Sequence, residues 1–116
     1  MLVNSIRYTF LLLAALAGCS SDPLPTEQLR VTDEAITQAV ASGAEDRREL
    51  AQAREHAAQA RAALANGRNK PARLEAERAE LDARLAEALV LRTQQQARTA
   101  QLQGRIARLR QQLEGR

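Results

Sequence analysis

Two side chains in this sequence could carry chemistry of their own, the single cysteine Cys19 and the single histidine His56. A lone thiol cannot form a disulfide within its own chain, and Cys19 has too few ligand-type neighbours to hold a metal. His56 follows a glutamate in an Ala-rich stretch, where we expect a surface side chain rather than a general base or a metal ligand. The acidic residues at 75–82 are typical of the first turns of a helix, where negative charge is favourable. We therefore predict that the protein is not an enzyme and has no metal or other dissociable cofactor.

The position of Cys19 after a hydrophobic segment indicates another use for its sulfur. Residues 1–7 carry the amino terminus and one arginine, and residues 8–16 form a short apolar stretch. That stretch cannot cross a bilayer, because a membrane-spanning helix needs about 20 apolar residues. A basic region followed by a short apolar core is typical of an export signal, so we predict a signal peptide at residues 1–18.

Leu16, Ala17, Gly18 and Cys19 form a pattern that resembles the lipobox of bacterial lipoproteins. The resemblance implies that a diacylglycerol is attached to the Cys19 sulfur, that the chain is cut before it, and that the new amino group takes an acyl chain such as palmitate. Each buried CH₂ contributes about 0.8 kcal/mol, so several acyl chains hold a protein stably at a membrane. Ser20 implies, by the same resemblance, the outer membrane on its periplasmic side. An ordinary signal peptide is the alternative interpretation.

Composition predicts the fold of the rest of the chain. Residues 19–26 are mostly polar and include two prolines, which favours a short tether after the lipidated cysteine. Beyond them the chain is rich in Ala, Arg, Gln, Glu and Leu, the residues with high helix propensity. We predict an all-α protein, either an Ala-rich antiparallel helical hairpin or a three-helix arrangement with a long, coiled-coil-like C-terminal helix. We place the Ala-rich helical domain at residues 27–91 and a basic C-terminal helix extension at residues 92–116.

Three helical segments follow the tether. The first is predicted to start at Thr26 as its N-cap, to turn Ile36 and Val40 toward its apolar side, and to end at Ser42 and Gly43.

The second segment is predicted at about residues 46–66, with Gly67 as its C-terminal cap and Pro71 in the first turn of the third. Its apolar face consists of Leu50, Ala53, Ala57, Ala60 and Leu64.

The third segment is predicted to continue without a break to Gly115, and it follows the seven-residue pattern of a coiled coil. With Leu74 at position d, the d residues are Leu74, Leu81, Ala88, Gln95, Leu102 and Leu109. The a residues are Arg78, Leu85, Arg92, Thr99, Ile106 and Leu113.

This third helix is longer than a compact three-helix bundle requires. In one architecture the first helix folds back at Ser42-Gly43 onto the other two, and the end of the third helix projects to pair with another chain. In the other, the first two helices stay nearly collinear and form one arm of a long hairpin. We favour the first, because an exposed apolar stripe near the C-terminus is expected at an oligomer or partner interface. The predicted partner seam consists of Leu102, Ile106, Leu109 and Leu113.

The C-terminal region is also basic. We expect Arg105, Arg108 and Arg110 to form a basic patch that can attract peptidoglycan carboxylates without a covalent link, lipid phosphates or an acidic partner. A solvated helix face is the plainer interpretation, because arginine also flanks coiled-coil seams. The sequence pI of about 10.0 would suit nucleic acid, but an exported protein meets none and residues for base stacking are lacking, so we expect no nucleic-acid binding.

The hairpin region is similar to a known family. Residues 53–88 read AREHAAQARAALANGRNKPARLEAERAELDARLAEA, which resembles the Ala-rich hairpin of the domain of unknown function 4398 (DUF4398) family. The resemblance spans roughly residues 30–95. It implies a helical fold and a place among short envelope lipoproteins, and it implies no activity.

We therefore expect a membrane-anchored helical lipoprotein of the bacterial cell envelope that acts as a structural or adaptor module by helix pairing. Its partners are the membrane through the lipid, and either a second copy of the chain or another envelope protein. The alternative is a regulatory lipoprotein that binds and activates a periplasmic enzyme or transport machine.

Overall fold

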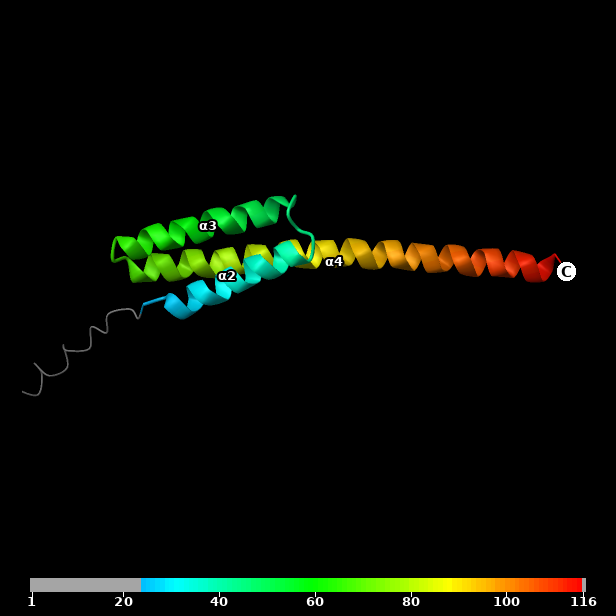
Figure 1. Ribbon diagram of the computed structural model, residues 1–116, viewed down its shortest axis with the longest axis horizontal. Helices are drawn as coiled ribbons and strands as arrows, with labels where there is room; N and C mark the ends of the chain where they lie inside the picture. The colour runs from blue at the N-terminus through cyan, green and yellow to red at the C-terminus, as the bar shows by residue number, and fades with distance from the viewer. Residues whose placement is uncertain (1–23, 116) are drawn as a thin grey trace, which may run out of the picture.

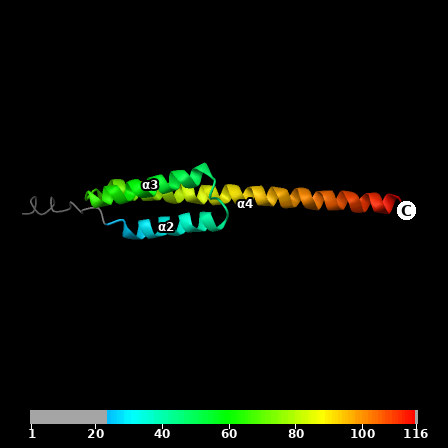
Figure 2. The same cartoon turned by 45° about the horizontal axis from the view of Figure 1, so that its top comes forward.

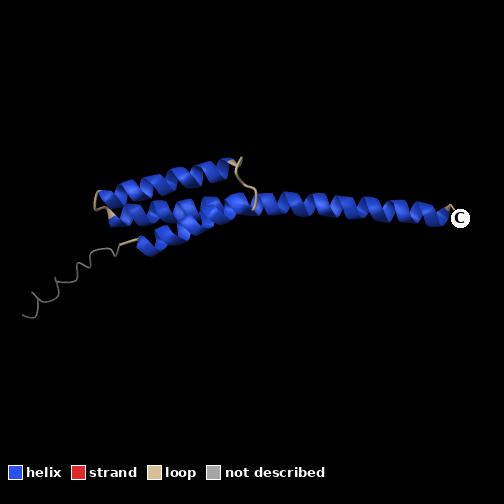
Figure 3. Cartoon of the chain, viewed as in Figure 1, coloured by secondary structure: helices blue, strands red, loops and turns tan. Residues whose placement is uncertain are grey.

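The computed structural model describes residues 24–115, which form three α-helices. Helix α2 spans Thr26–Ala41, α3 spans Arg48–Ala65 and α4 spans Asn69–Glu114. Helices α3 and α4 run antiparallel as a hairpin, and α2 packs against α4 as well (Figures 1 and 2). No strand occurs within the described range (Figure 3). The all-α fold with a long C-terminal helix is confirmed, and the predicted signal peptide at residues 1–18 lies outside the described residues.

The fold-back of the first architecture and the projecting end of its third helix are confirmed, whereas the pairing of that end with another chain stays a prediction. Helix α2 ends at Ala41, the chain reverses through Ser42 and Gly43, and α3 then runs back along α4 (Figure 1). The helices therefore form a bundle made of α2, α3 and the part of α4 up to Val90. The remainder of α4 continues beyond the bundle as a single helix.

Helices α3 and α4 meet through small side chains, which we call the Ala seam. It consists of Leu50, Ala53, Ala57, Ala60 and Ala63 on α3 and of Ala72, Ala76, Ala79, Ala83, Ala86 and Val90 on α4, all of them buried. The spacing alternates largely between three and four residues, which keeps the side chains on one helix face. Leu64, predicted for this face, is only half-buried, and Ala63 is buried in its place.

The end of the bundle near the α2–α3 turn holds the largest apolar side chain of the core. Leu50 is fully buried, and it clusters with Ala39 and Ala44 from the region of the turn and with Val90 of α4. The prediction that Val40 faces the core is wrong, since its side chain is 39% exposed and the adjacent Ala39 is buried instead. Residues one apart on a helix point about 100° apart, so only one of the two can face the bundle.

Both turns end a helix in the same way. After α3, the Gly67 amide donates to the Leu64 carbonyl at 2.9 Å and the Arg68 amide donates to the Ala63 carbonyl at 2.9 Å. Gly67 has φ +69°, a left-handed conformation that glycine adopts without strain. The turn after α2 repeats this pattern at Gly43, with φ +92°. The glycines predicted to end the two helices are therefore confirmed in that role.

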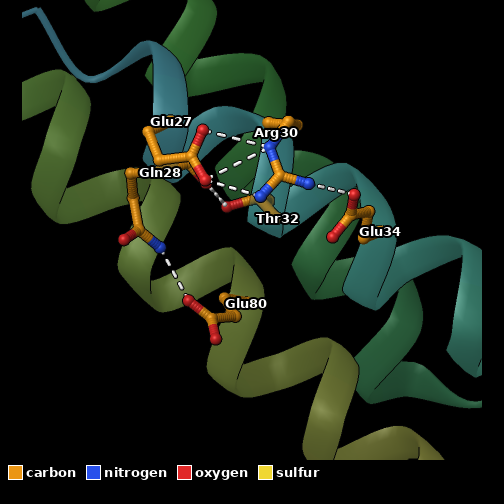
Figure 4. A network of polar contacts seen from close by, with 6 residues as sticks. All are labelled: Glu27, Gln28, Arg30, Thr32, Glu34 and Glu80. Atoms are coloured by element: carbon orange, nitrogen blue, oxygen red, sulfur yellow. Dashed lines mark hydrogen bonds and ion pairs between the residues drawn. The ribbon is translucent and has the colours of Figure 1, made fainter.

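Helix α2 is joined to α4 by polar side chains as well as by packing. The buried Thr32 hydroxyl lies 2.8 Å from the Ala76 carbonyl oxygen of α4, and Gln28 donates to Glu80 at 2.7 Å (Figure 4). Buried polar groups that find a partner in this way fix the orientation of one helix on the next.

The start of α2 differs from the prediction for Thr26. The N-cap residue is Pro25, no side chain caps the helix, and Thr26 is the first helical residue. Glu27 in the first turn accepts hydrogen bonds from Arg30, which also pairs with Glu34 (Figure 4). The hydrogen bonds and charge of Arg30 lower the pKa of the Glu27 carboxyl from its ordinary value.

Replacing Gly67 by alanine tests the role of its left-handed conformation. An added Cβ meets no atom within 4 Å, so the change acts only through the strained φ, and we expect the free energy of unfolding to fall by about 1–2 kcal/mol. Gly104→Ala is the matched control: Gly104 lies inside α4, where alanine raises helix stability by about 1 kcal/mol. Urea denaturation followed by circular dichroism measures both. Equal shifts of the same sign would contradict the assignment.

Candidate functional site

Helix α4 leaves the bundle after Val90 and continues through residues 91–115, which we call the extension (Figures 1 and 3). All residues of the extension are exposed except Gly104, which is half-buried. At 1.5 Å per residue the extension is about 37 Å long. Arg47 donates a hydrogen bond to the Thr93 hydroxyl at 3.3 Å near its start, but the bundle buries none of its side chains, so its exposed surface is the main candidate for an interaction site.

The predicted partner seam lies in this extension. Leu102, Ile106, Leu109 and Leu113 follow one another at steps of four and three residues, which lines them up along one side of the helix. Their exposed fractions range from 49% for Ile106 to 76% for Leu113. Four large aliphatic side chains in a row on an exposed helix are the pattern of a face that pairs with another helix.

The predicted basic patch surrounds the seam. Arg105, Arg108 and Arg110 are all exposed, and none of the arginines described within the extension forms an ion pair. In the bundle, by contrast, Arg54 pairs with Glu45 at 2.9 Å and Arg84 pairs with Glu80 at 2.7 Å. The arginines of the extension are thus left without an ion-pair partner among residues 24–115.

In the bundle half of α4, the residues of the heptad pattern do not face the other two helices. Leu74, Leu81 and Leu85 occupy a and d positions, yet they are exposed by 44%, 67% and 48%. The side chains that α4 turns toward α2 and α3 are alanines of the Ala seam, such as Ala79 and Ala83, which lie at b and f positions. The coiled-coil pattern is therefore not the one that packs the bundle.

Sequence reasoning missed a polar cluster between α3 and α4. The Nδ1 atom of His56 lies 2.8 Å from Glu75 Oε2, and its Nε2 atom lies 3.7 Å from Asp82 Oδ2. His56 is 30% exposed and Glu75 20% exposed, so neither is the free surface group that the sequence suggested. Arg78 donates to the other oxygen of Glu75 at 2.8 Å.

The hairpin geometry contains a signal that could have identified this cluster. With the turn near Gly67, a residue eleven positions before it faces the region about eleven positions after it. His56 then faces α4 near residue 78, between Glu75 and Asp82. Its contacts fix the register of the two helices. No group of three or more side chains within residues 24–115 could hold a metal ion.

The predicted lipidation site lies outside the described residues. Leu16, Ala17, Gly18 and Cys19 precede residue 24, so the lipobox stays a prediction from the sequence. Among the described helices, none combines the length and the apolar character that crossing a membrane takes.

Comparison with known proteins identifies the family. A crystal structure of a DUF4398 family protein from Pseudomonas aeruginosa PAO1 is similar to this chain, with 46% sequence identity and a TM-score of 0.73. The match covers 78% of this chain and 96% of the other. This chain belongs to the DUF4398 family. No family model matched in a scan, and no curated protein matched in a search. The DUF4398 resemblance predicted from the hairpin residues is confirmed.

In this DUF4398 protein, His56→Ala tests whether the polar cluster fixes the hairpin. Removing the imidazole leaves the half-buried Glu75 with one partner fewer, so we expect a loss of about 1 kcal/mol in the free energy of unfolding. Gln59→Ala is a control on the same helix, because Gln59 is exposed and bonds only to Glu55. Chemical denaturation measures both. A loss for His56→Ala no larger than for the control would contradict the role given to the cluster.

Proposed function

We propose that this protein is a lipid-anchored structural or adaptor module of the bacterial cell envelope, which acts by pairing its extension with another helix. The observation that carries the proposal is the exposed row of large aliphatic side chains from Leu102 to Leu113. The Ala seam shows that this chain packs its own helices through small side chains. The large side chains of this row, each about half exposed or more, are therefore available to a partner.

A purely solvated helix does not account for this row of side chains. In a helix that only projects into water, alanine would supply at least the helix propensity of leucine or isoleucine, and exposed apolar surface of this kind favours association. Burying one such side chain fully contributes about 1.5–3 kcal/mol, so four of them can hold two helices together.

The anchor is supported by the sequence and by the arrangement of the helices. Cys19 lies seven residues before Thr26, the first residue of α2, so a lipid on its sulfur would hold the bundle close to a bilayer. The start of α2 lies on the side of the bundle away from the C-terminus of α4 (Figure 1). The extension would then reach away from the site of attachment.

A regulatory lipoprotein that binds a periplasmic enzyme or transport machine is the second candidate. The unpaired arginines of the extension favour it, because positive charge beside an apolar row suits an acidic protein surface or the carboxylates of peptidoglycan. In either case the protein itself binds rather than catalyses, and no cofactor beyond the covalent lipid is proposed.

Metabolic labelling with radioactive palmitate tests the anchor. We expect label in the unaltered protein and its loss in Cys19→Ser, because the diacylglycerol is joined to the sulfur through a thioether and the serine hydroxyl is a much weaker nucleophile than a thiolate. Fractionation should find the unaltered protein in the outer membrane. An unaltered protein that carries no label would remove the anchor and the envelope location together.

Photocrosslinking in cells tests the helix-pairing role. A photoreactive residue at position 106 lies in the predicted seam, and one at position 111 lies on another side of the same helix. We expect a specific crosslinked product from position 106 and little from position 111, because only the seam contacts a partner. Leu102→Glu should abolish that product while the helical signal and melting of the bundle stay unchanged. Equal products from both positions would contradict pairing through the seam.

A further inference from the structure

The row of large apolar side chains on α4 is not confined to the extension. It starts at Leu74 in the bundle and follows the a and d positions to Leu113, and we call these positions the Leu stripe. Leu81 lies two residues from both Ala79 and Ala83, and two residues turn a helix by about 200°. The Leu stripe therefore lies on the side of α4 opposite the Ala seam, where neither α2 nor α3 covers it.

The two ends of the Leu stripe are alike in shape but opposite in flanking charge. Large aliphatic residues occupy both ends, whereas the middle holds Ala88, Arg92, Gln95 and Thr99. At the first end the flanking e and g positions include Glu75, Glu77 and Asp82. At the second end they include Arg98, Arg105 and Arg110. A partner helix that carries the reverse order of charge would match this surface.

We propose that the partner is a second copy of the chain, whose α4 pairs with this one in antiparallel orientation about a two-fold axis between residues 93 and 94. The proposal rests on the helix-pairing function and names its partner. In this register each a position meets a d position of the other copy. Leu74 packs on Leu113, Leu81 on Ile106 and Leu85 on Leu102. Leu109, the remaining large residue, lies against Arg78, whose aliphatic stem can cover it while the guanidinium stays near the surface.

Charge distinguishes this orientation from the parallel one. In a parallel pair in register, Arg78 of one chain would meet Arg78 of the other inside the interface, and Arg92 would meet Arg92. Arg105 of one chain would also lie beside Arg110 of the other. The antiparallel pair places Arg92 against Gln95 instead and brings Glu75 near Arg110.

One flanking pair, Arg84 with Arg105, has like charges in the antiparallel arrangement. Arg84 already pairs with Glu80 on its own helix at 2.7 Å, which neutralises much of its charge.

The size of the paired surface is sufficient for a stable dimer. The a, d, e and g positions between residues 74 and 113 comprise about 24 residues per chain, and stable interfaces use about 20–30 residues a side. An anionic membrane surface explains the basic half of the stripe alone, because the acidic flank of the other half would be repelled. A second copy uses both halves.

Site-specific crosslinking tests the register. Leu81→Cys and Ile106→Cys are introduced into separate copies of the full chain that carry Cys19→Ser, so each copy has one thiol. Both positions are exposed in the single chain, so neither change disturbs the bundle core. Treatment of the mixture with a short bismaleimide should link position 81 to position 106 at least tenfold more than either variant links to itself. A mixture of Leu81→Cys with Gln111→Cys is the matched control.

The possible outcomes separate this inference from the proposed function. Efficient linking of each variant to itself would indicate a parallel pair and overturn the inference. No link in any mixture, with a specific photocrosslink from position 106 to a different protein, would also overturn it and leave the helix-pairing function standing. If neither the photocrosslinking in cells nor the thiol crosslinking gives a product that depends on the partner seam, the proposed helix-pairing function is contradicted as well.

Discussion

Close packing of alanine against alanine is the interaction on which this structure depends. Alanine lets two helices approach closely, but each buried methyl group removes little apolar surface from water. Leu50 is the largest fully buried apolar side chain, and the buried Thr32 ties α2 to the backbone of α4. The bundle therefore gains specificity from tight contacts and from polar bonds such as that of His56 with Glu75, more than from the burial of large side chains.

The large aliphatic side chains of α4 lie outside the bundle, which reverses their usual place in a small domain. A free helix of the length of the extension is marginally stable in water, even with many good helix formers. Its residues are nevertheless helical to Glu114, and its exposed apolar row lies on the same side of α4 as the exposed leucines of the bundle half. The same helix thus serves two interfaces, an internal one built from small residues and an external one built from large residues. Its b and f positions are committed to the fold, and its a and d positions remain for association.

Much of this fold could be predicted from the sequence, because its turns carry strong local signals. Gly43 and Gly67 mark helix ends through left-handed conformations that other residues adopt poorly, and Pro71 marks a helix start because its missing N–H is tolerated only in the first turn. The faces were harder to assign on α4, since alanines and leucines there repeat at the same spacings of three and four. Periodicity identifies a stripe but does not tell which stripe meets the rest of the chain. The contact of His56 with Glu75 was missed for a related reason, because it depends on how two helices align across a turn.

The two flanks of α4 connect the self-pairing to the membrane anchor. Side chains of α2 bond to Glu80 and Glu87, which are c positions and lie on the same side of α4 as the g positions. His56 of α3 contacts Glu75 and Asp82, which are e positions on the other side of α4. In an antiparallel coiled coil, g residues face g residues and e residues face e residues across the pair. The α2 helices of both copies would therefore lie on one face of the dimer, and both α3 helices on the other.

Lipids on both chains could then enter one bilayer, with the paired α4 helices lying along its surface. A parallel pair brings the g side of one chain to the e side of the other, so its two α2 helices would lie on opposite faces. Such a pair could attach both lipids to one bilayer only by standing upright. The orientation of the pair therefore decides whether the extensions lie along the membrane or project from it.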